Sequence, residues 1–223
     1  AMGELYMYAN ELAAARKIEP RQDIITVLLS AEGDQQLSEH EFDLFVLLLA
    51  VAGNETTRNG ISHGVLAMIE NPDQWNLLKN DSSLVTTAVE EILRWGTPVN
   101  NFRRTAVCDV ELHGVQIKEG DCVTMLYPSA NRDAAVFADP FKFDIARNPN
   151  PHVTFGGGGP HFCLGANLAR LEMRILFEEM AKRIDSIELT GEVRKLRSSF
   201  IHGIKTLPVK LTPQAATHPA FAG

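Results

Sequence analysis

A run of four glycines, Gly156 to Gly159, constrains this chain more than any other feature of its sequence. Glycine has no side chain to pack and loses the most backbone freedom on folding, so the run indicates that the backbone passes close to another body. It lies within F-G-G-G-G-P-H-F-C-L-G, residues 155–165, and apolar residues at helical spacing follow it. Cys163 is therefore predicted at the start of a helix, where unpaired N–H groups and the helix dipole favour a thiolate.

Three roles are open to a cysteine in this position. The first is a small buried hydrophobic side chain, which is the usual state of an unpaired cysteine. The second is a hydrolytic nucleophile with His161 as its base, although residues two apart on a turn rarely face each other and no hydrolase signature surrounds them. The third is an axial thiolate to haem iron, which needs a flat surface, a closely approaching backbone and a cation for a propionate. No Gly-x-Gly-x-x-Gly or Gly-Lys-Ser/Thr motif supports nucleotide binding here.

Composition and charge narrow the class of protein. The chain contains 45% apolar and 22% charged residues, as expected for a soluble globular protein that can bury a core. A net charge of −7 without a Lys/Arg cluster argues against nucleic acid as a partner. The cysteines, Cys108, Cys122 and Cys163, fit neither a disulfide framework nor a zinc site, which predicts a reducing, cytoplasmic setting. The longest apolar run, residues 42–53, is only about half the ~20 residues that a membrane span requires.

One long helix is predicted over residues 38–70. Ser38 and Glu41 have the spacing of a capping box at its start. Residues 42–52 are apolar nearly all round, which predicts a helix buried in the middle of a fold. The pattern then breaks into Gly53-Asn54-Glu55-Thr56-Thr57, which places polar groups and a weak point in the wall of a core. The alternative is that the helix simply reaches the surface at Gly53.

The remaining pattern predicts a mainly helical protein with small antiparallel β-sheets. Residues 1–16 and 21–31 read as two further helices. Residues 107–127 alternate strand-like runs with turns, and residues 187–211 read as strands around a hairpin.

The stretch at residues 155–165 resembles the cysteine loop of the cytochrome P450 superfamily, the haem-thiolate monooxygenases. Counting back from Cys163, His161 and Gly159 match the usual Phe-Gly-x-Gly-x-His-x-Cys-x-Gly pattern, Gly165 matches beyond it, and Phe155 stands one residue further away. This longer, glycine-richer loop is similar to bacterial members that oxidise branched lipids and sterol side chains. The resemblance implies haem b as cofactor and Cys163 as the iron ligand. The cofactor contacts that it implies on the loop are Phe155, Gly157, His161, Cys163 and Gly165.

The stretch A-G-N-E-T, residues 52–56, resembles the oxygen-binding segment of the same family. In that family a local distortion of the helix opens a groove over the iron, so Ala52 and Gly53 are expected to lie against the haem. Thr56 would hold a water that delivers protons, and Glu55 would connect it to bulk solvent. Splitting dioxygen takes two protons, so a dry apolar wall needs one hydroxyl and one acid.

A shorter amphipathic helix, which stops at Gly96, carries Glu91 and Arg94 on one face. Taken alone, the two would form a surface ion pair that contributes less than ~1 kcal/mol. The resemblance instead implies a buried Glu-x-x-Arg pair that supports the cysteine loop together with an arginine from an irregular segment. Arg147 matches this third member, with Lys142 as the alternative.

The resemblance also implies further cofactor and substrate contacts. Arg104, five residues before Asp109, matches the arginine that pairs with a haem propionate, with Arg103 as the weaker alternative. The candidate substrate contacts are Val99, Asn100, Phe102, Phe200 and Ile201. An edge hairpin without a ligand is the alternative for the last two.

The four motifs occur in family order, so the fold expected is the carboxy-terminal half of a cytochrome P450, with residues 1–211 in one domain and 212–223 as a tail. The amino-terminal half has no counterpart in this sequence, so apolar walls would face water and the chain alone is expected to be weakly stable and prone to aggregate.

For the full-length protein, the resemblance implies a monooxygenase that hydroxylates a lipid or steroid-like substrate with O₂. Its electrons would come from NAD(P)H through a ferredoxin and its reductase. The alternative is a haem-binding or scaffold fragment without turnover.

Overall fold

The computed structural model describes residues 2–31, 33 and 36–215, which form helices and small two-stranded antiparallel sheets. This agrees with the fold class predicted from the sequence. The chain divides into two compact units, residues 1–55 and 56–223. The assignment of residues 1–211 to a single domain stays a prediction.

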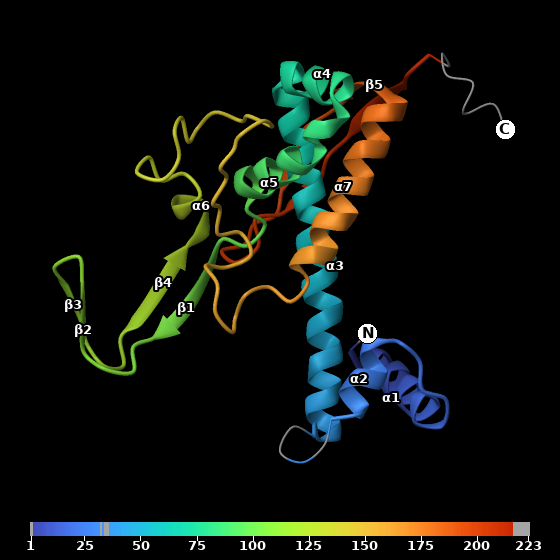
Figure 1. Ribbon diagram of the computed structural model, residues 1–223, viewed down its shortest axis with the longest axis vertical. Helices are drawn as coiled ribbons and strands as arrows, with labels where there is room; N and C mark the ends of the chain where they lie inside the picture. The colour runs from blue at the N-terminus through green and yellow to red at the C-terminus, as the bar shows by residue number, and fades with distance from the viewer. Residues whose placement is uncertain (1, 32, 34–35, 216–223) are drawn as a thin grey trace. The chain divides into compact units, whose positions relative to one another are not determined.

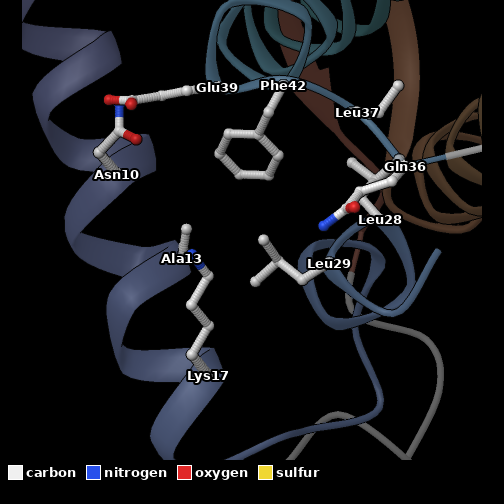
Figure 2. Close-up of a pocket in the computed structure, with 9 residues that line it drawn as sticks. All are labelled: Asn10, Ala13, Lys17, Leu28, Leu29, Gln36, Leu37, Glu39 and Phe42. Carbon is white, nitrogen blue, oxygen red and sulfur yellow. The ribbon is translucent and has the colours of Figure 1, made fainter. Parts of the chain in front are cut away.

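The first unit contains α1 (Met2–Ile18), α2 (Ile24–Leu29) and the beginning of α3 (Glu39–Glu70). Their buried contacts form a small core of Ala9, Ala13, Ile25 and Phe42. This unit also encloses a cavity of about 310 Å³, which Figure 2 shows between these helices. None of the predicted site residues lines that cavity.

Side-chain caps set the starts of two helices in this unit. The Asp23 carboxylate accepts a hydrogen bond from Thr26 N at 2.9 Å, so α2 begins three residues later than the predicted start at Arg21. The predicted capping box of α3 is confirmed. Ser38 N donates to Glu41 Oε2 at 2.8 Å, and Glu41 N donates to Ser38 Oγ at 3.3 Å.

The predicted burial of residues 42–52 is wrong for this chain. Phe42 is buried, but Leu44, Leu48 and Val51 are 45%, 60% and 59% exposed. These three residues follow i, i+4 and i+7 spacing and therefore form one apolar stripe along α3. No described element of the first unit covers it. The helix is continuous from Glu39 to Glu70, so Gly53 does not interrupt it.

The longer helical segments described in the second unit are residues 56–70 of α3, α4 (Pro72–Asn80), α5 (Val85–Gly96) and α7 (Ala166–Arg183). Figure 1 shows α5 and α7 side by side. The sequence analysis did not predict α4. A 3₁₀ turn at Ser82–Leu84 joins α4 to α5.

A glycine permits the close packing of this unit. A Cβ atom at Gly64 of α3 would lie 2.5 Å from the Phe177 ring of α7 and 2.7 Å from Ile92 of α5. Around this point, buried apolar residues of α3, α5 and α7 pack into one hydrophobic cluster. Its best-buried members are Ala67, Met68, Leu78, Ala88, Val89, Ile92, Ile145, Met173 and Phe177.

The strands pair in two-stranded antiparallel ladders. The pairs are β1 (Asn101–Thr105) with β4 (Cys122–Leu126), β2 (Val110–Leu112) with β3 (Val115–Ile117), β5 (Ile184–Leu189) with β8 (Val209–Pro213), and β6 (Arg194–Lys195) with β7 (Ile204–Thr206). The predicted sheets at 107–127 and 187–211 are present, although the first begins earlier, at Asn101. The β2–β3 hairpin extends beyond the β1–β4 ladder (Figure 1).

An irregular segment at residues 131–165 connects the short helix α6 (Tyr127–Ala130) to α7. At the other end of α7, β8 continues to Pro213, two residues into the predicted tail. Gln214 N then donates to Arg183 O at 2.8 Å, which fixes the start of that tail. Residues 216–223 of the tail lie outside the described residues.

Candidate functional site

The cysteine loop is closed by one backbone hydrogen bond. Cys163 N donates to Phe155 O at 3.0 Å, and Ala166 N donates to Cys163 O at 3.2 Å. Gly165 is the N-cap of α7, so Cys163 lies directly before this helix, as predicted. Its side chain is exposed, which excludes the role of a buried hydrophobic residue.

Backbone conformation explains most of the glycine run. Gly156, Gly158 and Gly159 have φ values of +96°, +102° and +75°, in the left-handed region that favours glycine. A Cβ atom at Gly157, Gly158, Gly159 or Gly165 would meet no described atom of this chain within 4 Å. The loop therefore presents bare backbone to open space.

The predicted Glu-x-x-Arg pair is buried. Glu91 and Arg94 are both 0% exposed, and Arg94 Nε and NH2 donate to the two carboxylate oxygens at 2.7 and 2.8 Å. Arg147 Nε donates to Glu91 Oε2 at 3.1 Å, which makes Arg147 the third member. The surface-pair interpretation is wrong. Lys142 contributes only its carbonyl oxygen, which accepts hydrogen bonds from both arginines.

Asn131 connects this buried network to the cysteine loop. Its carbonyl oxygen accepts a hydrogen bond from Arg94 NH1 at 2.9 Å. Its side chain accepts from Val153 N at 2.8 Å and donates to Thr154 Oγ1 at 3.0 Å. The contacts described here show that the three charged residues hold the irregular segment directly, and that they reach the loop through Asn131. The sequence analysis missed Asn131, because nothing in its spacing distinguishes it from other loop asparagines.

A second anionic residue on α5, Glu90, was also missed. Its carboxylate accepts hydrogen bonds from Arg170 Nε at 2.7 Å and Arg170 NH2 at 3.0 Å, and lies 2.9 Å from His152 Nε2. Burial raises the pKa of Glu90, but the hydrogen bonds from His152 and Arg170 outweigh it and lower that pKa to about 2. His152 Nδ1 accepts a hydrogen bond from Thr154 N at 3.3 Å, so His152 supports the backbone next to the cysteine loop.

The candidate substrate residues come together from two distant segments. Val99 forms an isolated antiparallel bridge with Ile201, and Asn100 N donates to Phe200 O at 2.8 Å. The rings of Phe102 and Phe200 meet edge to face, with centroids 5.4 Å apart. Both rings are largely exposed, at 41% and 46%. The structure therefore brings the two candidate segments together, with the rings of Phe102 and Phe200 in contact.

Arg104 lies on β1 opposite Val123 and is exposed. Because successive residues of a strand point to opposite faces, Arg104 shares a face with Phe102, whereas Arg103 does not. This alternation distinguishes Arg104 from its neighbour.

The predicted oxygen-binding residues all lie on α3. Ala52 and Gly53 are exposed, and a Cβ atom at Gly53 would meet no described atom within 4 Å. Glu55 and Thr56 are half-buried and each has a polar partner. Glu55 belongs to the first unit and Thr56 to the second. The roles implied for them stay predictions.

Comparison with known proteins identifies the family. The sequence profile described as cytochrome P450 matches residues 5–200. The chain belongs to the cytochrome P450 family. The steroid C26-monooxygenase of Rhodococcus jostii is 53% identical over 207 residues, which cover 92% of this chain and 44% of that protein. The methyl-branched lipid omega-hydroxylase of Mycobacterium tuberculosis is 52% identical over 204 residues, 91% of this chain and 48% of that protein.

Solved P450 structures have the same fold. A Mycobacterium marinum cytochrome P450 in complex with pseudoionone superposes with a TM-score of 0.88 at 44% identity, over 92% of this chain and 50% of that one. A Bacillus megaterium P450 in complex with testosterone gives a TM-score of 0.88 at 38% identity, over 94% and 59%. This P450 chain thus spans about half the length of its relatives.

Membership of the P450 family indicates a haem cofactor, and the residues of the cysteine loop fit one. The exposed Cys163 thiol supplies the ligand, and the bare glycine backbone leaves room for a flat ring. Phe162 and Leu164 flank the thiol and are 45% and 74% exposed, so they offer apolar surface to a porphyrin. His161 is exposed beside them. Among the described contacts no hydrogen bond joins His161 to Cys163, so the cysteine-hydrolase interpretation has no geometric support.

None of the helices that the structure describes combines the length and the apolar character that a membrane crossing requires.

Proposed function

We propose that the P450 protein represented by this chain is a haem-thiolate monooxygenase that hydroxylates an apolar substrate, a lipid or a steroid-like molecule. The observation that carries the proposal is the exposed Cys163 thiol, fixed by its amide to Phe155 O at the end of a bare glycine loop. The steroid C26-monooxygenase and methyl-branched lipid omega-hydroxylase, each above 50% identity, support the substrate class.

The cofactor would be held by residues of the second unit. When bound, a haem with an axial thiolate supplies the chemistry of dioxygen activation and hydrogen abstraction. Cys163 would provide the thiolate, and the backbone at Gly157 and Gly165 would admit the ring. The propionates would be bound by His161 and Arg104, which are exposed on the cysteine loop and on β1.

Two residues of α3 would move protons. The Thr56 hydroxyl would hold a water by accepting and donating hydrogen bonds, and the Glu55 carboxylate would exchange protons between that water and solvent. Ala52 and Gly53, one turn earlier, carry little or no side chain.

The apolar surface around Phe102 and Phe200 would bind the substrate. Its members are two aromatic rings, two β-branched side chains and one amide, so it would recognise hydrocarbon with a single polar contact. Such a surface favours an alkyl chain or a sterol skeleton over a charged metabolite.

The reaction would need partners beyond this chain. O₂ and two electrons are consumed in each hydroxylation, and we propose NAD(P)H, a ferredoxin reductase and a ferredoxin as the source of these electrons. The cytoplasmic location inferred from the cysteines stays a prediction.

A haem-binding chain without turnover is the second candidate. Besides the α3 stripe, Leu168, Leu171 and Ile175 of α7 are 58%, 42% and 52% exposed. Exposed apolar faces of helices are usually covered in a working enzyme. The two relatives contain about twice the residues of this chain.

Turnover assays separate the two candidates. The 223-residue chain and a protein extended by an amino-terminal P450 half would be loaded with haem and given ferredoxin, reductase, NADPH and a methyl-branched fatty acid or a sterol. Hydroxylated product from the extended protein alone supports the fragment interpretation for this chain. Product from neither protein, with haem bound to both, contradicts the monooxygenase proposal.

A further inference from the structure

Two adjacent carboxylates on α5 face different parts of the molecule. Consecutive helical residues point about 100° apart. Glu91 therefore faces the irregular segment and the arginines Arg94 and Arg147, whereas Glu90 faces α7 and the base of the cysteine loop. The family pattern accounts for Glu91 only, and Glu90 has no role in it.

Glu90 holds Arg170 in a bidentate ion pair. Both guanidinium hydrogen bonds, at 2.7 and 3.0 Å, go to separate carboxylate oxygens, which fixes the plane of the guanidinium as well as its position. His152, whose side chain is 2% exposed, lies 2.9 Å from the second oxygen and blocks one side of the pair. An arginine held in this way has little freedom to rotate.

The fixed guanidinium lies on the Phe155 ring. Its central carbon is 4.6 Å from the ring centroid, a cation–π contact. Phe155 is also the residue whose carbonyl oxygen accepts the Cys163 amide at 3.0 Å. Phe155 thus contacts Arg170 through its ring and Cys163 through its backbone carbonyl oxygen.

Electrostatics agree with this geometry. The pKa of Arg170 is raised, first by its hydrogen bond to Glu90 and also by the negative charge of that carboxylate.

We propose that Glu90 and Arg170 are positioning residues for Cys163, because their ion pair fixes Phe155, whose carbonyl oxygen in turn orients the cysteine. The inference rests on the proposed function only in taking Cys163 as the iron ligand. The Glu90–Arg170 pair thereby adds a restraint on the ligand that is independent of Glu91.

Hydrogen exchange of the Cys163 amide tests this in the chain without haem. Glu90→Gln and Arg170→Met remove opposite ends of the pair, and each is expected to speed exchange of that amide by about tenfold, the effect of one charge-assisted hydrogen bond. The double variant should exchange no faster than either single one, because the two residues act through one contact. Arg174→Met is the matched control, since Arg174 lines the same groove between α5 and α7 but has no described hydrogen bond to Glu90.

The exchange rates of other amides, measured in the same experiment, distinguish a local effect on Cys163 from general destabilisation. Core amides such as that of Phe177 should keep their exchange rates in every variant. If Arg170→Met changes the exchange rates of these core amides, Arg170→Lys replaces it, because lysine keeps the positive charge but cannot form the bidentate contact. In Arg170→Lys only the Cys163 amide should change, with an exchange rate between those of the unsubstituted chain and Arg170→Met. Unchanged Cys163 exchange in both single variants, or an equal change in Arg174→Met, overturns the proposal.

Haem binding gives a second readout and separates this inference from the proposed function. In haem-loaded chain, Glu90→Gln and Arg170→Met should each lower the fraction of reduced carbonyl complex that carries the thiolate spectrum. If the unsubstituted chain binds no haem through sulfur, the proposed function fails, while the exchange rates still decide the role of Glu90.

Discussion

Replacing Glu91 by Gln should destabilise the second unit far more than the small change in volume suggests. The Glu91 side chain is 0% exposed and accepts hydrogen bonds from Arg94, Arg147, Asn150 and the Asp144 amide. A glutamine keeps the shape but removes the charge. It leaves Arg94 buried without a counter-charge and directs an amide N–H toward the donors.

The expected loss follows from this burial. Removing one partner of a buried ion pair costs about 3–5 kcal/mol, because the remaining charge stays desolvated. Whole domains are stable by only ~5–15 kcal/mol, so the variant loses a large fraction of the total. With a urea m-value of about 1–3 kcal/mol per molar, the unfolding midpoint should fall by at least ~1 M.

Urea unfolding followed by tryptophan emission is the assay. Both tryptophans, Trp75 and Trp95, lie in residues 56–223, so emission reports the unit that contains Glu91. Glu178→Gln on α7 is the control, because Glu178 pairs with Lys182 at the surface. The control midpoint should not move beyond experimental scatter. Equal shifts for the two variants would refute the argument that burial sets the magnitude.

Three further predictions follow from burial and packing. The pKa of Glu90 is about 2 in the folded chain, below its ordinary 4.5. The ionised Glu90 therefore stabilises the fold fully above pH 4.5, and this stabilisation is lost as the pH falls toward about 2. The urea unfolding midpoint of Glu90→Gln should depend less on pH in this range than that of the unsubstituted chain. Burial, and then the neighbouring His202, lower the pKa of His63 from 6.5 to about 4. The unfolded chain therefore binds this proton first, and stability should fall between pH 6.5 and 4, less steeply in His63→Gln. Gly64→Ala should lower the free energy of unfolding by about 1–3 kcal/mol, because the new Cβ would lie 2.5 Å from the Phe177 ring. Gly60→Ala is the control and should not destabilise the fold, because its nearest contact is an ordinary 3.5 Å. Equal urea unfolding midpoints for the two variants would contradict this account.

Local signals were predicted well from the sequence. The capping box at Ser38 and the three-residue spacing of Glu91 and Arg94 depend on residues within one helical turn, and the structure has both. The resemblance named two segments about 100 positions apart as candidate substrate contacts, and these segments pair in the structure. Their contact with a substrate stays a prediction. The contacts of Glu90 were missed, because its partner Arg170 is 80 residues away and no spacing rule connects the two.

The burial of residues 42–52 was predicted wrongly for a physical reason. An apolar helix indicates that its surface needs a cover, but its pattern does not show whether the same chain supplies that cover. Leu44, Leu48 and Val51 are exposed, and the relatives are about twice as long as this chain. The prediction of weak stability and aggregation for the chain alone rests on these exposed faces. A cooperative melt of a soluble monomer above about 60 °C, the upper end for mesophile domains, contradicts it.

The visible spectrum of the reduced carbonyl complex tests the assignment of Cys163 most directly. Chain reconstituted with haem should show the red-shifted Soret band of a thiolate-ligated carbonyl complex. Cys163→Ser should lose that band, whereas Cys108→Ser and Cys122→Ser, at the two other exposed cysteines, should keep it. A band of nitrogen- or water-ligated haem in the unsubstituted chain, or a thiolate band that survives Cys163→Ser, would contradict the assignment of this cysteine as the iron ligand.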